Sequence, residues 1–190
     1  MKIKNLIFLC FTLLVGCGVP HYVDFFRYHD DGTPKPKVVF LPICREPCDQ
    51  EMADYLDEAI RWKTMDNGQL YLYSVEEINA ARLNNVKDVR CFKPADFVVE
   101  TELVQNALAT YENPCNMPIN SKHHCARLIQ LRMRITDIRC EPPKVILYEV
   151  IEGNKLLTLS QAESRRAREV PEQLMEDAVA KIEDTINCAN

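Results

Sequence analysis

The sequence has little glycine and none of the short motifs that mark the common catalytic sites. It holds five glycines and one tryptophan in 190 residues. It contains no Gly-x-Ser-x-Gly, no glycine-rich phosphate-binding loop and no His-Glu-x-x-His, which argues against the enzyme classes that depend on these motifs. After Val15 it also lacks an apolar run of the roughly 20 residues that a membrane-spanning helix needs.

The most informative stretch lies at the amino terminus. Lys2 and Lys4 precede an apolar run of 10 residues from Leu6 to Val15, and Gly16-Cys17 follows the run. A basic start before a short apolar run is typical of a secretory signal, and this run is too short to span a bilayer. Two other interpretations of the run remain open: a buried core helix, and the cleaved signal of a soluble secreted protein.

The motif Leu14-Val15-Gly16-Cys17 resembles the lipobox of bacterial lipoproteins. The resemblance implies that residues 1–16 are a signal peptide and that Cys17 receives a diacylglyceryl thioether and, after cleavage, an amide-linked acyl chain such as palmitate. Two or more acyl chains hold a protein stably on a membrane. Position 18 is Gly, whereas Asp at this position retains enteric lipoproteins in the inner membrane. The resemblance therefore implies an outer-membrane lipoprotein whose domain faces the periplasm.

The remaining chain is acidic and suits a single domain. Without Lys2 and Lys4 it carries 21 basic and 28 acidic side chains, a net charge of −7, which argues against a nucleic-acid partner. Residues 17–37 are rich in turn signals and form a predicted tether, and residues 38–190 form one periplasmic domain. The tether carries four aromatic residues, which either dock on the domain or rest at the membrane interface: Tyr22, Phe25, Phe26 and Tyr28.

Cysteine is abundant for a chain of this size. Disulfides are the expected state in an oxidising compartment. Seven cysteines follow Cys17, and an odd number leaves at least one thiol free, bound to another group or paired with another chain. Cys188 is the best candidate for a disulfide-linked oligomer, although pairing with its own domain is equally open. The seven candidate disulfide cysteines are Cys44, Cys48, Cys91, Cys115, Cys125, Cys140 and Cys188.

Two local cysteine patterns have the residue types of a redox or metal site. Cys44 and Cys48 have a C-x₃-C spacing, which differs from the redox C-x-x-C motif and favours disulfides. Cys115 and Cys125 flank a predicted loop with His123 and His124. A loop-closing disulfide is favoured there over a zinc site because the ligand spacing is poor, and a Cys125–His catalytic pair is disfavoured because neighbouring residues seldom share the required geometry. We therefore expect no metal and no cofactor.

Hydrophobic periodicity predicts an α/β fold with a mixed sheet: βαβα, then a strand, a long β-hairpin and a carboxy-terminal helix. A helix is expected from a cap at Asp49 to Gly68, and a capping box at Ser74-x-x-Glu77 opens the next one. A loop is expected at residues 87–94, and a turn at residues 152–155 with a further pairing segment at 156–159. The expected strands are residues 38–43, 69–73, 96–104, 128–137 and 145–151, with a phase slip after Asp137. The last helix starts at Pro171 and ends before Cys188, and its predicted inward face consists of Leu174, Ala178, Ile182 and Ile186.

Three stretches also resemble the α/β domain shared by the curli-secretion lipoprotein and the lipoprotein activators of penicillin-binding proteins. They are Val38 to Ile43, Ala95 to Glu100, and Leu131 to Arg139 with its partner strand. The resemblance implies a similar fold over residues 37–188. It transfers no functional residue.

Together these features predict a lipid-anchored envelope lipoprotein that is not an enzyme and that binds or scaffolds envelope proteins. Arg132 and Arg134 project from one side of their strand. They would either meet an anionic surface such as lipopolysaccharide or belong to a solvated sheet face. Two alternatives remain: an activator of a wall-building enzyme, and a thiol-dependent envelope enzyme.

Overall fold

A computed structural model describes residues 27–43, 45, 49–91, 95–110, 125–157 and 172–190. The chain divides into two compact units, residues 1–35 and 36–190. In the first unit, Tyr28 and Pro34 form an isolated antiparallel bridge. Asp30, Asp31 and Gly32 turn the chain between them, and Gly32 takes a positive φ of 82° that favours glycine.

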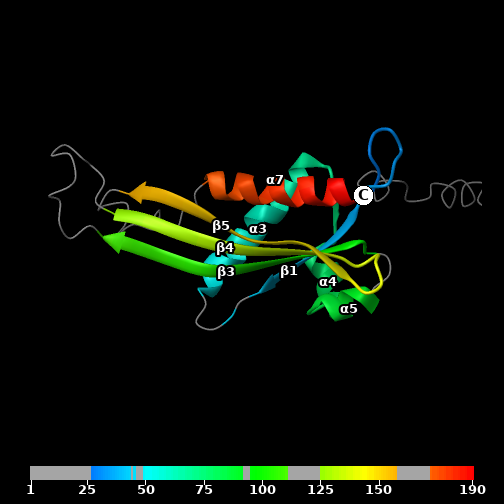
Figure 1. Ribbon diagram of the computed structural model, residues 1–190, viewed down its shortest axis with the longest axis horizontal. Coiled ribbons are helices and arrows are strands. Elements are labelled where there is room, and N and C mark those ends of the chain that lie inside the picture. Colours follow the sequence, from blue (N-terminus) through cyan, green and yellow to red (C-terminus); the bar gives the residue numbers. More distant parts are fainter. Residues whose placement is uncertain (1–26, 44, 46–48, 92–94, 111–124, 158–171) are drawn as a thin grey trace, which may run out of the picture. The chain divides into compact units, whose positions relative to one another are not determined.

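The second unit contains a five-stranded sheet in the order β2-β1-β3-β4-β5 (Figure 1). β1 pairs in parallel with β2 and β3, whereas β3, β4 and β5 are antiparallel neighbours. The mixed sheet confirms the predicted fold class. The strand bounds are β1 Lys37–Ile43, β2 Tyr71–Leu72, β3 Phe97–Thr110, β4 Cys125–Asp137 and β5 Lys144–Leu157.

The larger core lies between the sheet and two helices, α3 (Gln50–Asn67) and α7 (Glu172–Ala189). Alternate residues of β1, β3 and β4 point into this core because side chains in a strand change face at each step. The inward face predicted for α7 is confirmed, since Leu174, Ala178, Ile182 and Ile186 are all buried. Figure 1 shows α7 along one side of the sheet with α3 next to it.

A smaller core occupies the opposite face of the sheet. Val39, Leu41 and Val98 pack there against α4 (Val75–Ala80) and α5 (Val86–Cys91). These two helices cover β1 and the first part of β3. Figure 1 shows them at one end of the sheet, so they leave most of the long β3-β4-β5 ribbon without a helix on this side.

Local capping signals were predicted correctly. The Asp49 carboxylate accepts from the Met52 N–H at 3.1 Å at the start of α3, and Gly68 ends the helix in the left-handed region at φ 68°. Ser74 and Glu77 form the expected reciprocal capping box at the start of α4. Side chains adjacent in sequence determine these bonds, which is why the pattern alone identified them.

Several predicted boundaries are wrong. Residues 86–91 form α5 rather than a loop, and Val89 on this helix is fully buried. The turn at residues 152–155 does not exist, because β5 continues through it and stays paired with β4. The phase slip expected after Asp137 lies between Ile135 and Thr136. Strand β2 has two residues rather than five, and Cys188 lies inside the last turn of α7 instead of beyond it.

Arg139 joins the end of β4 to the end of α7. Its guanidinium donates to both carboxylate oxygens of Asp137, at 3.1 and 2.9 Å, and to the Ala189 carbonyl at 2.8 Å. It also lies over the Phe97 ring, 4.4 Å from the centroid. A cation at the carboxyl end of a helix is favourable because the last carbonyls carry partial negative charge.

We expect the contact between Arg139 and Asp137 to make the free energy of unfolding decrease at acid pH. The hydrogen bond from Arg139 lowers the pKa of Asp137 below its ordinary value of 3.8. A carboxyl with a lowered folded-state pKa adds stability above its unfolded-state pKa and loses it as the pH falls through the folded-state pKa. Urea unfolding followed from pH 7 to pH 3 should show this loss in the parent protein and a smaller one in Asp137→Asn. An equal pH dependence in both proteins would contradict the assignment.

Candidate functional site

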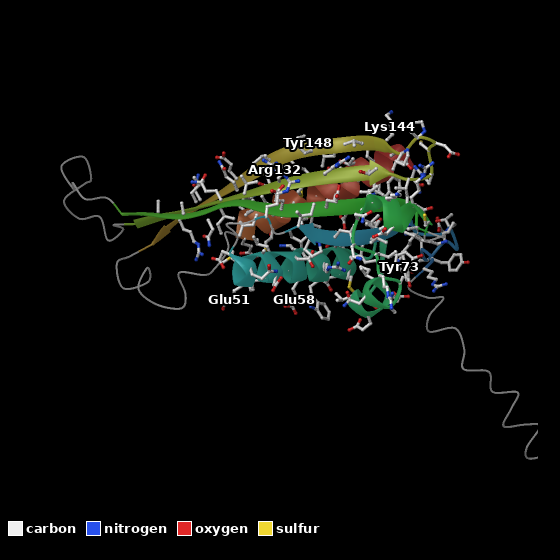
Figure 2. All side chains as sticks on the ribbon, turned by 90° about the horizontal axis from the view of Figure 1, so that it is seen from below. Glu51, Glu58, Tyr73, Arg132, Lys144 and Tyr148 are labelled. Carbon is white, nitrogen blue, oxygen red and sulfur yellow. The ribbon has the colours of Figure 1, made fainter. Side chains whose placement is uncertain are left out.

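The candidate site is the uncovered part of the sheet, on the side opposite α7. We call it the open sheet face. No described helix or strand lies over it, and Figure 2 shows Arg132 and Tyr148 on this side of the ribbon. Four large apolar side chains on it are well exposed, and Tyr148 is 66% exposed. The face comprises Glu100, Glu102, Val104, Gln130, Arg132, Arg134, Val145, Tyr148, Val150 and Glu152.

The strand register brings these residues into rows across the sheet. Glu100 lies opposite Arg134, which lies opposite Tyr148 on β5. In the next row Glu102 lies opposite Arg132, which lies opposite Val150. Directly opposed side chains on antiparallel strands lie close enough to interact. Each row therefore runs from a carboxylate through a guanidinium to an exposed apolar side chain at β5.

The two predicted arginines both have carboxylate partners within the face. Arg132 donates to Glu102 at 2.7 Å, and this bond raises the pKa of Arg132. Arg134 lies 3.5 Å from a Glu100 oxygen. Arg45 also contacts the Glu102 carboxylate, at 3.3 Å. The glutamates balance the arginines, so the face lacks the excess of positive charge by which an anionic polymer would be attracted.

This arrangement suits a protein surface as a partner. Tyrosine and arginine are enriched at protein interfaces, and the exposed valines offer apolar area between them. In each pair the arginine is partly exposed and its glutamate is largely buried, so the guanidinium is the charged group that a partner can reach. The groups that the face offers to a partner are carboxylates, guanidinium groups and apolar side chains.

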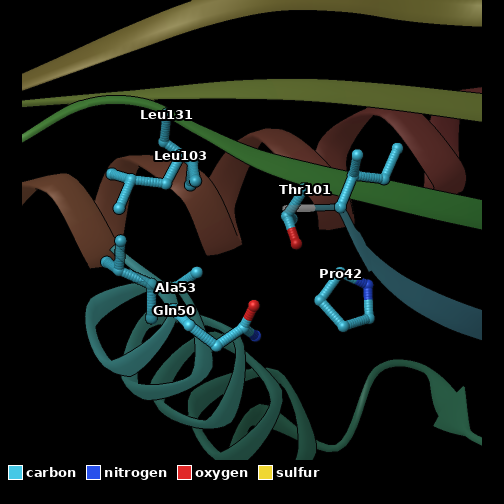
Figure 3. A pocket seen from close by; sticks show the side chains of 8 residues that line it. Pro42, Gln50, Ala53, Thr101, Leu103 and Leu131 are labelled. Carbon is cyan, nitrogen blue, oxygen red and sulfur yellow. The ribbon is translucent and has the colours of Figure 1, made fainter. Parts of the chain in front are cut away.

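A hollow of about 50 Å³ lies beside the start of α3, on the other side of the sheet (Figure 3). Pockets that bind small-molecule ligands usually have volumes of about 300–1,000 Å³. This hollow is therefore too small to enclose such a ligand. Two of its residues have polar side chains, Gln50 and Thr101. The lining consists of Pro42, Ile43, Gln50, Ala53, Leu56, Thr101, Leu103 and Leu131.

The structure describes three of the candidate disulfide cysteines as free and exposed: Cys91, Cys140 and Cys188. Cys140 follows Arg139, and Cys188 precedes Ala189, so two of the thiols flank the same contact between β4 and α7. Cys17, Cys44, Cys48 and Cys115 lie outside the described residues, and Cys125 belongs to β4 without a described side chain.

The structure leaves the predicted loop site with His123 and His124 untested, because residues 111–124 lie outside its described part. Within the described ranges, no three His, Cys, Asp or Glu side chains are grouped so that they could hold a metal ion. No helix in those ranges is long and apolar enough to cross a membrane.

Sequence reasoning missed the acidic half of the open sheet face. Glu100 and Glu102 have side chains only 12% and 10% exposed, although both are charged. Their alternation with Val99, Thr101 and Leu103 was a detectable signal of a strand with one polar side. Their arginine partners belong to another strand, and only the register of β3 on β4 identifies them.

These features define a small α/β domain built on one mixed sheet with a partly apolar, charge-balanced open face. Residues 24–189 match a family of unknown function, DUF7499, and the chain belongs to this family. Comparison with curated proteins gave no match.

Solved structures with a similar fold come from several bacteria. The hypothetical protein CT253 from Chlamydia trachomatis has a TM-score of 0.57 at 20% identity, with 82% of this chain and 99% of that chain covered. Protein XCC0632 from Xanthomonas campestris, of family DUF330, has a TM-score of 0.53 at 9% identity, with 82% and 87% covered. Lipoprotein GNA1162 from Neisseria meningitidis has a TM-score of 0.47 at 11% identity, with 80% and 98% covered. The two matches with TM-scores above 0.5 support the fold, and identities of 20% and 9% leave the function to be argued from this chain.

Proposed function

We propose that this protein is a lipid-anchored lipoprotein of the bacterial outer membrane whose periplasmic domain binds or scaffolds other envelope proteins without catalysing a reaction. The anchor is supported by the lipobox ending at Cys17. Acyl chains hold a domain on a membrane without a spanning helix. The partner is another envelope protein, bound at the open sheet face.

The observation that carries the binding role is the row from Glu102 through Arg132 to Val150. Arg132 is held in place by a 2.7 Å bond to Glu102, a side chain that is itself mostly buried. A positioned guanidinium loses less conformational entropy on binding than a mobile one. Next to it, Tyr148 and Val150 offer apolar area that a partner would remove from water.

A charge placed in the centre of this apolar area should break the complex. We expect Val150→Arg to shift the protein from a larger species to the monomer when mild-detergent extracts of native membranes are run on native gels. Val75→Arg is the matched control, because Val75 on α4 is similarly exposed but lies outside the open sheet face. A larger species that survives Val150→Arg would exclude this face, and turnover of an envelope substrate by the purified protein would exclude a non-catalytic role.

Disulfides form the finer part of this proposal. The thiol of Cys188 is exposed at the end of α7, where another chain can reach it. Denaturing gels of the same membrane extracts, run with and without reductant, test this pairing. A band that collapses on reduction and disappears in Cys188→Ser, but persists in Cys91→Ser, would support a disulfide-linked partner. A monomer in both lanes would confine any disulfides to one chain.

A further inference from the structure

The outward side of α3 exposes large apolar side chains. The inward side buries Met52, Leu56 and Ile60 in the larger core. On the outward side, Trp62 is 65% exposed, Met65 52% and Tyr55 48%. Trp62 is the only tryptophan in the protein. Tryptophan, tyrosine and methionine are among the residues enriched at protein interfaces.

These apolar side chains share one face of the helix with two acidic residues. Glu51, Tyr55, Glu58, Trp62 and Met65 are separated alternately by four and three residues, the spacing that forms a contact seam between two helices. We call this line the outer seam of α3. Figure 2 shows Glu51 and Glu58 projecting away from the sheet. At 1.5 Å per residue the seam is about 21 Å long.

The charge along the seam is negative. Glu58 contributes to this charge, and Asp54 and Asp66, which are exposed at the two sides of the seam, add to it. The basic residues of α3 do not offset it. Lys63 contacts Glu176 on α7 at 3.1 Å, and Arg61 is buried against Asp57.

We propose that the outer seam of α3 docks a cationic amphipathic helix from another envelope protein, at a site separate from the open sheet face. Apolar residues of such a helix would pack between Tyr55, Trp62 and Met65. Its lysines and arginines would meet Glu58 and the flanking carboxylates, and a guanidinium over the Trp62 ring would add a cation–π contact. An anionic lipid surface is disfavoured as the partner because the seam repels it.

The single tryptophan allows a direct test. The full chain is titrated with a synthetic amphipathic peptide of leucine and lysine, and with a leucine–glutamate peptide that has the same apolar face. The lysine peptide should shift Trp62 emission to shorter wavelength and reduce its quenching by iodide. The effect should weaken as salt is added, because screening reduces the charge attraction. The glutamate peptide should leave the emission unchanged.

Matched variants locate the binding, measured by the anisotropy of labelled lysine peptide. Trp62→Ala and Glu58→Lys should each weaken binding by about tenfold, which corresponds to about 1.4 kcal/mol. Tyr148→Ala removes an equally exposed aromatic ring from the open sheet face, and Asp184→Lys makes the same charge change on α7. Both controls should bind like the parent, and circular dichroism checks that all four variants fold.

Four results would overturn the proposal. Trp62 emission that stays unshifted with the lysine peptide would show that the peptide does not bind at the seam. Controls that weaken binding as much as Trp62→Ala would indicate non-specific charge attraction. Trp62 emission that shifts with phospholipid vesicles instead of the lysine peptide would identify a membrane surface as the partner. Without any peptide, Trp62 could already emit at short wavelength and resist quenching by iodide. That result would show that the chain itself covers the seam.

Discussion

Replacing Cys17 with alanine is expected to abolish lipid attachment. The Cys17 thiol is the only group in the lipobox-like motif that can form the thioether. In proteins that share this motif, the signal peptide is cleaved only after the cysteine has been lipidated. Mass spectrometry of the amino-terminal peptide should therefore find residues 1–16 retained and no diacylglyceryl mass. Incorporation of labelled palmitate should fall to background.

Cys10 provides the matched control for this experiment. It lies in the same apolar run, upstream of the motif, so Cys10→Ala should be cleaved and lipidated like the parent. Each methylene buried in the bilayer contributes about 0.8 kcal/mol, and stable attachment needs at least two acyl chains. An unmodified Cys17 in the parent protein would remove the basis for the membrane anchor and for the proposed outer-membrane location.

Replacing Arg61 with alanine should cause the largest loss of folding stability among the polar substitutions considered. The Arg61 guanidinium donates to the Asp57 carboxylate at 2.8 Å and to the Phe40 carbonyl at 2.7 Å. It also lies 5.3 Å from the centre of the Phe40 ring. Strand β2 pairs with β1 only as far as Val38, so Arg61 satisfies a β1 carbonyl beyond the end of β2.

Arg61→Ala would leave both the carboxylate and the carbonyl buried without this partner. Burial already raises the pKa of Asp57 despite the neighbouring arginine. Removing one member of a buried ion pair typically costs about 3–5 kcal/mol. Urea unfolding at neutral pH should show a loss of this size. Lys63→Ala on the same helix breaks a more exposed pair with Glu176 of α7 and should cost less than about 1 kcal/mol.

A double variant distinguishes the ion pair from simple packing. Arg61→Met with Asp57→Leu removes both charges and keeps apolar volume, and such replacements are often neutral or stabilising. We expect this double variant to recover most of the stability lost in Arg61→Ala. A free energy of unfolding as low as that of Arg61→Ala would show that the bond to the Phe40 carbonyl, rather than the charge pair, is the main contribution.

The predictions that were confirmed depend on neighbours in the sequence. Asp49 and Gly68 bound α3 because cap residues bond backbone groups within a few positions, and the inward face of α7 follows from its 3.6-residue period. The missed helix α5 has one buried residue, Val89, in six. A segment this short has too few turns to show a helical period, so its position against the smaller core was needed to recognise it.

The turn predicted within β5 was wrong for a related reason. Glu152, Gly153 and Asn154 favour a turn in isolation, but pairing with β4 holds them in the strand. Gly153 lies opposite Ile129, which is fully buried. Backbone hydrogen bonds to a long neighbouring strand outweigh the weak local preference of three residues.

The sequence by itself determined the predicted anchor at Cys17, the caps, and which side of each long strand and helix is apolar, because each depends on residues close together in the chain. Only the tertiary structure decided what those sides contact. It paired Glu102 with Arg132, 30 positions later, placed Arg61 on the Phe40 carbonyl 21 positions earlier, and left Trp62 facing solvent. Contacts over such separations depend on how the strands align and how the helices dock. These arrangements minimise the free energy of the whole domain, and no local pattern encodes them.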